Sequence, residues 1–391
     1  MTTIDALIVG AGPAGSAMAA GLGRAGARVL LLEWAHHPRP KACAEYASPR
    51  IVEELTHIGL APEAWSDEAV PLSGMHLHAG GHAVKIAYAD QFGSRRAWGI
   101  DRRRFDERLA RHAVDSGAQL REGARVVELT HGGGRVSGAR IRDMRTRRTE
   151  TIEADWVIGA DGARSTVARL LGVDRAVRFP RRLGLIAHYA GVTDLTDHGE
   201  MHVGRGWYVG LAPTPGGELN VGMALPMVDS GRSAELRFEA AIDALPAVAG
   251  RLAGSTRISP IRGAAPIGHR VNNAAGPGWI LIGDAAGFVD PFTGEGIHRA
   301  LRSARAAADA LAAGGDVAAT YRRARRRAFA AKTALSWLVQ GFLAIPPLLE
   351  HAVERLEARP SATLLLGSAL GDCRPATDAL SPRALFEVLR P

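Results

Sequence analysis

Gly10, Gly12 and Gly15 form a G-x-G-x-x-G pattern between an apolar run and a helical segment. At such a turn the first glycine permits a tight bend, the second lets a pyrophosphate approach the backbone, and the third lets helix and strand pack closely. The helix begins near Pro13 and Ala14, and its first N–H groups present a partial positive charge to phosphates. The pattern therefore predicts a dinucleotide-binding turn.

An acidic residue follows the glycine turn at the distance that is typical of dinucleotide-binding folds. Glu33 ends the second predicted strand, 23 residues after Gly10. Its carboxylate is placed to accept hydrogen bonds from the ribose 2′-hydroxyl of an adenosine. A 2′-phosphate would be repelled there, so the sequence disfavours NADP at this particular site.

Two further pairs of glycine and aspartate follow predicted strands. Asp161 and Gly162 come after DWVIGA, and Gly283 and Asp284 come after WILI. Together with the first turn, these motifs resemble those of the FAD-dependent oxidoreductases of the glutathione-reductase superfamily. The chain is most similar to the branch that holds the p-hydroxybenzoate hydroxylase type, flavin halogenases and geranylgeranyl reductases.

The resemblance spans roughly residues 5–313 and implies a role for each matching motif. It places Asp284 on the ribityl chain of the flavin and Asp161 in a largely structural position near the pyrophosphate. The segment RRRFDERL matches the family pattern R-x-x-F-D-x-x-L, which implies that Arg102 lies against the cofactor.

A later segment, DPFTGEGI, resembles the D-P-x-T-G-x-G-I of geranylgeranyl reductases and related hydroxylases. Its glycines let a helix N-terminus approach the isoalloxazine, where N–H groups and the helix dipole stabilise negative charge at N1–O2 on reduction. The resemblance implies five cofactor-binding residues in this segment: Pro291, Gly294, Glu295, Gly296 and Ile297.

Two residues are candidates for catalysis, although most of the chemistry would belong to the flavin. The segment PKACAE resembles the family loop P-K-x-C-G-E beside the flavin, with Ala44 in place of the usual glycine. Lys41 is expected to contact a cofactor phosphate or the substrate. Cys43 is interpreted as a passive wall residue, with a reactive catalytic thiol as the alternative. His298 follows GEGI and is the second candidate, with capping or packing as its alternative.

Histidines raise the question of a metal site. His76, His78 and His82 form the tightest group, two on one strand face and one past a Gly-Gly turn. Because cysteines and a neighbouring carboxylate are missing from this stretch, the sequence predicts no metal. Motifs of serine hydrolases, zinc proteases and P-loop proteins do not occur in the sequence.

Composition narrows the function classes further. Hydrophobic residues make up 47% and charged residues 23% of the 391 residues, which excludes wholesale disorder. The two cysteines cannot build a disulfide framework, so we expect a reducing, cytoplasmic setting. The net charge of +8 rests on scattered arginines that fit no nucleic-acid module.

The high content of Ala, Gly and Arg is typical of GC-rich coding, and we expect a bacterial protein. No stretch reaches the about 20 apolar residues of a membrane-spanning helix.

The elements that would position these residues start as strand, helix and strand: 6–9, 12–25 and 28–32. Residues 183–225 then form a run of predicted β-segments, which suggests an antiparallel sheet inserted into an α/β unit. The last 75 or so residues are predicted to be helical. We therefore expect an α/β fold with a doubly wound Rossmann-type FAD-binding domain, an inserted antiparallel-sheet substrate domain and a helical C-terminus.

The domain boundaries follow from these transitions. The FAD-binding domain is expected to be discontinuous, over residues 1–71, 99–175 and 265–330. The substrate domain takes residues 72–98 and 176–264, and residues 331–391 form the helical C-terminal segment.

The apolar side chains Trp207, Tyr208, Val209 and Met223 are expected to line the substrate pocket, with strand alternation turning half of them inward. The first prediction is a monooxygenase that takes NAD(P)H as a transient reductant and O2 as a co-substrate. It would hydroxylate or epoxidise a small apolar or aromatic secondary metabolite.

Two alternatives stay open. DPFTGEGI favours a geranylgeranyl-reductase-like reductase of C=C bonds, and the same fold also carries non-catalytic binding proteins. The halogenase signature W-x-W-x-I-P is missing, which disfavours halogenation. A monomer or a homodimer is expected, and the apolar C-terminal helices leave peripheral membrane contact open.

Overall fold

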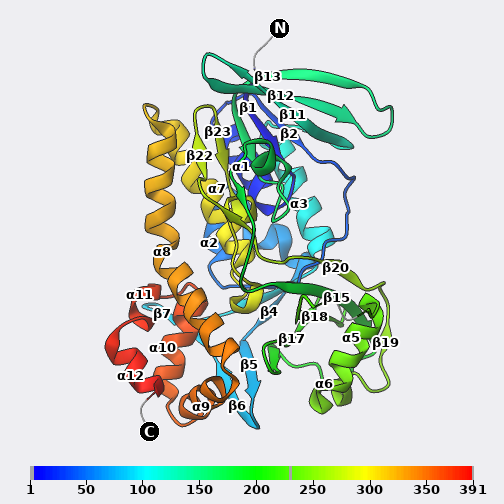
Figure 1. Cartoon of the computed structure of the whole chain (residues 1–391), viewed down its shortest axis with the longest axis vertical. Helices are drawn as coiled ribbons and strands as arrows, with labels where there is room; N and C mark the ends of the chain where they lie inside the picture. The colour runs from blue at the N-terminus through cyan, green and yellow to red at the C-terminus, as the bar shows by residue number, and fades with distance from the viewer. Residues whose placement is uncertain (1–3, 229–230, 390–391) are drawn as a thin grey trace.

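The computed structural model describes residues 4–228 and 231–389, so the outermost residues of the predicted domains lie outside the described part. The first sheet lies near the N-terminus at one end of the molecule, and the other large sheet lies with the C-terminal helices at the opposite end (Figure 1). Helix α7 and the long helix α8 lie beside the first sheet, and α8 extends toward the other one (Figure 1).

The first sheet has a parallel core in the order β10-β2-β1-β13, with β23 continuing beside β13. Strand β2 and residues 6–9 of β1 are runs of apolar residues, as parallel strands covered on both faces require. Strands β11 and β12 extend the sheet beyond β13 in antiparallel fashion. The bounds are β1 (Ile4–Val9), β2 (Val29–Leu32), β10 (Gln119–Arg121), β11 (Ala124–Gly132), β12 (Arg135–Asp143), β13 (Thr149–Gly159) and β23 (Trp279–Leu281).

Three helices pack together beside this sheet: α1 (Pro13–Arg24), α3 (Arg102–Asp115) and α7 (Gly296–Ala313). Helix α3 begins at Arg102. The reason is Asp101, whose side chain accepts hydrogen bonds from the backbone N–H groups of Arg103 and Arg104 and so caps the helix. The parallel sheet core with helices packed beside it has the expected Rossmann-type α/β arrangement.

The second sheet runs in the order β19-β15-β18-β17-β16-β5-β6, with β20 beside β15. It is antiparallel except at β16 and β5, which pair in parallel. A parallel pair needs a long connection, and these two strands come from distant parts of the chain. The bounds are β5 (Gly74–Ala79), β6 (His82–Ile86), β15 (Arg182–Ala190), β16 (His198–Val203), β17 (Tyr208–Thr214), β18 (Glu218–Pro226), β19 (Thr256–Arg257) and β20 (Arg262–Ala264).

The two faces of this sheet carry different cores. Tyr208 and Met201 belong to a cluster with Phe292 and residues of the C-terminal helices. Val209 and Met223 belong to a cluster with Phe238 of α5 (Ala234–Asp243), beside α6 (Pro246–Arg251). The Tyr208 face is therefore directed toward the DPFTGEGI segment, and the opposite face is directed away from it.

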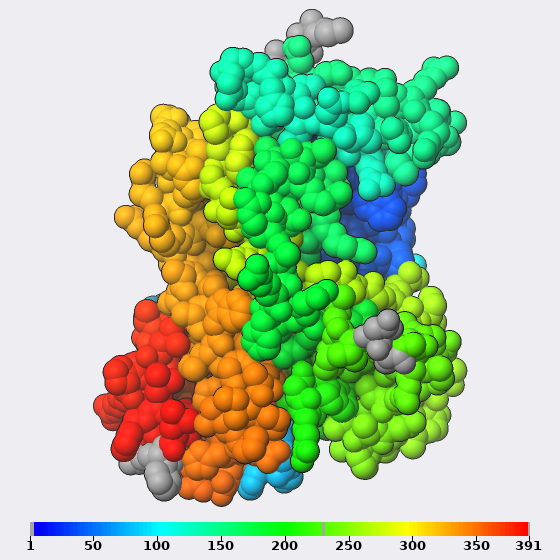
Figure 2. Space-filling model, in the orientation of Figure 1, coloured from blue at the N-terminus to red at the C-terminus, as the bar shows by residue number. Residues whose placement is uncertain are grey.

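The C-terminal helices confirm the expected helical ending. They form the orange and red part of the surface, next to the green part of the second sheet (Figure 2). Leu343 and Leu349 are buried in the cluster beneath that sheet. The helices are α8 (Val317–Ala344), α9 (Pro346–Glu357), α10 (Pro360–Leu370), α11 (Ala376–Ala379) and α12 (Pro382–Leu389).

Within the described residues, no single helix is long and apolar enough to cross a membrane. Helices α8 and α9 reach that length and hydropathy only together, and they are bent by 113°.

Short elements complete the chain. The helical ones are α2 (Ile51–His57), α4 (Thr166–Leu170), η1 (Pro62–Glu68), η2 (Gly283–Ala286) and η3 (Pro291–Thr293). The strands are β3 (Tyr46–Ala47), β4 (Ala69–Leu72), β7 (Tyr88–Asp90), β8 (Gly93–Arg95), β9 (Ala97–Ile100), β14 (Asp174–Arg175), β21 (Arg270–Val271) and β22 (Ala275–Gly276).

Candidate functional site

The glycines of the first turn have three different steric roles. Gly10 has a φ of +104°, and a Cβ there would lie 2.6 Å from the carbonyl oxygen of Ala160. A Cβ on Gly15 would lie 1.8 Å from the carbonyl oxygen of Gly10, so helix and strand need a glycine to pack. A Cβ on Gly12 would meet only Arg39, at 3.6 Å. The space beside Gly12 is therefore open for a ligand.

The groups around this space suit a pyrophosphate. The cap of α1 at Gly12 makes no side-chain hydrogen bond and the first turn holds no acidic residue, so its N–H groups remain available. Arg39 Nη2 lies 3.1 Å from Glu33 Oε2. Arg39 Nε is buried and has no hydrogen-bond partner among the described residues. An unused cationic donor beside an uncapped helix end fits a bound phosphate, and sequence reasoning missed Arg39 because it matches no motif.

Glu33 lies at the end of β2, as its predicted role demands. It is 2% exposed and accepts hydrogen bonds from the backbone N–H groups of Ala11 (3.0 Å) and Ala35 (3.2 Å). A carboxylate offers about four acceptor positions. With two of these positions filled and Arg39 as an ion-pair partner, Glu33 keeps acceptor capacity for a ribose hydroxyl.

The two aspartates of the later motifs have contrasting surroundings. Asp161 accepts hydrogen bonds from Ser165 Oγ (2.6 Å) and from the N–H of Thr166 (2.6 Å), and burial raises its pKa. These contacts fix the start of α4. Asp284 is half-buried and its side chain has no hydrogen bond or ion pair in the part of the chain that the structure describes. Gly283, with a φ of +59°, lies so close to Ala14 that a Cβ would come within 3.0 Å of the Ala14 Cβ. The first and third motifs therefore meet.

The start of α7 resembles the start of α1. Its cap at Glu295 makes no side-chain hydrogen bond, no acidic residue follows in the first turn, and a Cβ on Gly296 would meet nothing within 4 Å. Gly294 has a φ of +66° and lies against the Tyr46 ring, 2.9 Å from where its Cβ would be. This open helix N-terminus fits the isoalloxazine of FAD.

Pro291 and Ile297 lie on either side of this helix start. Pro291 begins η3, and Ile297, in the first turn of α7, is buried in the core cluster of the first sheet. Their predicted cofactor contacts stay predictions.

Asp290 connects this segment to the second sheet. Its carboxylate accepts hydrogen bonds from Arg182 Nη1 (2.6 Å), the Tyr208 hydroxyl (2.6 Å) and the N–H of Phe292 (3.1 Å). Asp290 raises the pKa of Tyr208, after burial, which is the larger cause. Sequence reasoning included Asp290 in the motif and missed its two partners.

The side chains of Glu295 and His298 line a cavity of about 210 Å³ between α7 and α8. Lys332 Nζ lies 3.5 Å from Glu295 Oε2 and 2.8 Å from Asp372 Oδ1, and His298 Nδ1 lies 3.0 Å from Asp372 Oδ2. Although burial opposes it, Lys332 and His298 hold the pKa of Asp372 well below its usual range. His298 is thus an ion-pair partner of Asp372, and its predicted catalytic role stays a prediction.

Arg102 joins the loop of Cys43 to α3. Its Nε and Nη2 donate to the Asp106 carboxylate (2.8 and 3.0 Å), and its Nη1 donates to Cys43 Sγ (3.2 Å). Burial raises the pKa of Asp106, but Arg102 outweighs it and Lys41 adds a smaller lowering, so the net shift is downward. The structure brings Cys43 and Arg102 together, and their predicted places beside the flavin stay predictions.

A buried polar network beside this loop escaped the sequence analysis. Glu45 Oε2 lies 2.7 Å from His188 Nε2 and accepts a hydrogen bond from Asn220 Nδ2 (3.0 Å). Glu45 Oε1 accepts one from the N–H of Arg102 (3.1 Å). The hydrogen bond to Glu45 raises the pKa of His188 against the effect of burial. Glu45 stands in the PKACAE segment, but nothing in the sequence pairs it with residues of β15 and β18.

Strand alternation divides the predicted substrate-pocket residues. Tyr208 faces Phe292, with ring centroids 5.0 Å apart. Val209 and Met223 belong to the cluster on the opposite face, and Trp207 packs against that same cluster. Of the four residues, Tyr208 alone has its side chain in the cluster that contains Phe292.

Residues 3–334 match the FAD binding domain family. The chain belongs to this family. It is 35% identical over 328 residues to a menaquinone reductase of Mycolicibacterium smegmatis, covering 80% of this chain and 78% of the relative. It is 30% identical to a digeranylgeranylglycerophospholipid reductase of Methanosarcina mazei, covering 78% of this chain and 74% of the relative.

The fold is also similar to that of a solved structure. A flavoprotein/dehydrogenase of Cytophaga hutchinsonii superposes with a TM-score of 0.85 at 21% identity, covering 99% of this chain and 97% of the other. The protein is an FAD-dependent oxidoreductase, and its open turns and unpaired groups fit FAD.

Proposed function

We propose that this protein reduces C=C bonds in the polyprenyl chain of a lipid, with a prenylated quinone as its substrate class. The observation that carries this proposal is the 35% identity to a menaquinone reductase over 328 residues. The digeranylgeranylglycerophospholipid reductase adds support, because the molecules in both names carry polyprenyl chains. These relatives favour the reductase over the monooxygenase that the motifs alone placed first.

The residues of the chain have separate tasks in this proposal. FAD, when bound, supplies the hydride, and saturation of a C=C bond also needs one proton. The N-termini of α1 and α7 orient the cofactor, and Asp284 holds its ribityl chain. Cys43 Sγ, 3.2 Å from Arg102 Nη1, is the proposed proton donor and regains its proton from solvent.

The test is a single-turnover reaction under anaerobic conditions. Holoprotein reduced with NAD(P)H or dithionite is mixed with a menaquinone that has an unsaturated side chain, and the product is reoxidised in air before mass spectrometry. Reoxidation returns the ring to the quinone, so a lasting gain of two hydrogens reports saturation of the chain. We expect this gain. Reduction of the ring alone, or an added oxygen in an aerobic reaction, would overturn the proposal.

The proton donor is tested in the same assay. Cys43→Ala is expected to lower the rate of chain saturation by about 100-fold, the lower end of the usual contribution of general acid catalysis. FAD binding by the variant, followed by flavin absorbance, should persist. An unchanged rate would make Cys43 a passive part of the wall.

A further inference from the structure

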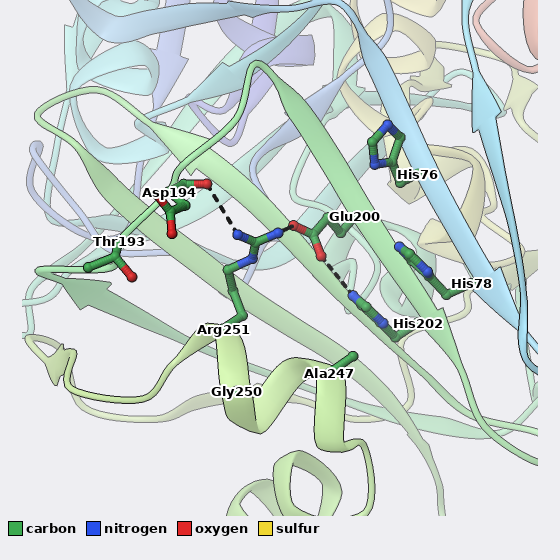
Figure 3. A pocket seen from close by; sticks show the side chains of 9 residues that line it. All are labelled: His76, His78, Thr193, Asp194, Glu200, His202, Ala247, Gly250 and Arg251. Carbon is green, nitrogen blue, oxygen red and sulfur yellow. Dashed lines mark hydrogen bonds and ion pairs between the residues drawn. The ribbon is translucent and has the colours of Figure 1, made fainter.

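Two neighbouring strands of the second sheet place a row of metal-ligand side chains on one face. Strands β5 and β16 pair in parallel with His76 opposite Glu200 and His78 opposite His202. Because side chains two residues apart share a face, all four point the same way. Figure 3 shows this face directed toward α6. It is the face opposite to the cluster that contains Tyr208 and Phe292.

Three of these side chains already lie close enough to share an ion. One ligand atom from each of His78, Glu200 and His202 lies within 4.8 Å of the other two. His202 Nε2 is 2.9 Å from Glu200 Oε2, and the rings of His78 and His202 are stacked, with centroids 4.4 Å apart. Zinc binds nitrogen and carboxylate oxygen at about 2.0–2.2 Å. Binding therefore requires the two rings to turn out of their parallel stack and close on the ion by about an ångström.

The site opens into a cavity of about 320 Å³ whose lining includes these side chains, Thr193, Asp194 and residues of α6. Figure 3 shows Arg251 of α6 reaching Glu200. Arg251 Nη2 lies 2.8 Å from Glu200 Oε1, and its Nη1 donates to the backbone carbonyl of Asp194 (3.1 Å). Arg251 thus holds one oxygen of Glu200 and leaves Oε2 toward the histidines, as groups around a metal ligand commonly do.

We propose that His78, Glu200 and His202 bind one divalent ion of the zinc class, with the fourth position open to the cavity. The sequence predicts no metal because Glu200 and His202 lie more than 120 residues from His78. Only the parallel register of β5 and β16 supplies the missing carboxylate. The site lies on the face of the sheet opposite to Tyr208, and it is independent of the proposed reductase activity.

The test measures Zn²⁺ binding to tag-free holoprotein by titration calorimetry at neutral pH. We expect one ion per chain. His78→Ala and Glu200→Gln should each weaken binding at least about 10-fold, because each removes a ligand. The matched control is His82→Ala on the same hairpin: His82 pairs with Glu357 of α9 on the other side of the sheet, and its loss should leave binding unchanged.

Two further measurements distinguish the loss of a metal ligand from the loss of the folded state. Flavin absorbance and the melting temperature without metal show whether each variant is folded, and His78 is only partly buried, so its replacement is mild. Co²⁺ in place of Zn²⁺ should give the visible absorption of a four-coordinate site in the control and lose it in His78→Ala. Absence of one-to-one binding, or equal affinity in the His78→Ala and Glu200→Gln variants and the parent, would overturn the proposal.

Discussion

At the scale of single residues, the candidate FAD site is marked by groups that have no partner within the described chain. Asp284 is a half-buried carboxylate without a hydrogen bond or ion pair there, and Arg39 Nε is a buried donor without an acceptor. Buried or half-buried polar groups are normally satisfied. Their opposite charges suit different parts of one ligand. The Asp284 carboxylate can accept hydrogen bonds from hydroxyl groups, and the Arg39 guanidinium can donate them to a phosphate.

Replacing Asp284 by asparagine is expected to weaken FAD binding about 10-fold or more. A hydrogen bond to a charged group contributes about 1.5–3 kcal/mol, and the variant loses the charge. Fluorescence titration of the apoprotein with FAD measures the effect. Asp309→Asn, which changes an exposed residue of α7, should bind FAD as the parent does, and equal affinities in all three proteins would contradict the role of Asp284.

At the scale of elements, the glycines in and before helix α1 differ in the space around them. Some lie in tight contact with the neighbouring backbone, and others face open space. Gly15 has no space for a side chain, whereas Gly12 faces open space and Gly21 meets nothing within 4 Å. Gly15 belongs to the contact of helix and strand. We propose that Gly12 lies on the path of the pyrophosphate, whereas Gly21 lies on a part of α1 with space for a methyl group.

Three alanine variants of α1 should therefore behave differently. Gly15→Ala is expected to cost about 1–3 kcal/mol or more in unfolding free energy, because its Cβ overlaps the backbone of Gly10. Gly12→Ala should keep that stability and lower FAD affinity at least about 10-fold. Gly21→Ala is the control and should raise stability by about 0.5–1 kcal/mol. Urea unfolding and FAD titration measure both quantities, and parallel losses in Gly12→Ala and Gly15→Ala would refute the distinction.

At the scale of the whole molecule, two buried polar networks tie the second sheet to loops of the FAD-binding part. Asp290 receives Arg182 and Tyr208, and Glu45 contacts His188 and Asn220. Buried networks of this kind fix relative orientation because every member must keep its partners. They place the Tyr208 face of the sheet opposite the N-terminus of α7.

The contact of Glu45 and His188 makes stability depend on pH. The pKa of His188 is raised in the folded protein, so protonation favours the folded state. Its contribution is complete below the unfolded-state pKa of about 6.5 and is lost as the pH rises through the folded value. Relative to His188→Gln, the parent should lose unfolding free energy as the pH is raised from about 6 to about 9.

Urea unfolding of FAD-saturated protein across this range provides the measurement. The exposed His131 supplies the control, because His131→Gln should follow the parent at every pH. A constant difference between the parent and His188→Gln would show that the pair does not titrate as expected.

The sequence by itself determined the FAD-binding fold and its local motifs. The expected roles of Gly12, Gly15 and Glu33 depend mainly on neighbours within one strand, turn and helix, so spacing along the chain is enough to predict them. The open start of α7 was predictable for the same reason. The helical C-terminus followed from composition and periodicity.

Tertiary structure alone decided which distant side chains meet. Arg39 reaches Glu33, Glu45 reaches His188, and His78 reaches His202 through loop paths and strand register that no local pattern encodes. Strand alternation put Val209 on the face opposite to Tyr208, and the register of β17 with β18 put Met223 on the same face as Val209. Pairing of strands far apart in the chain is set by the packing of the whole core, and so the polar networks and the proposed metal site appear only when the chain is folded.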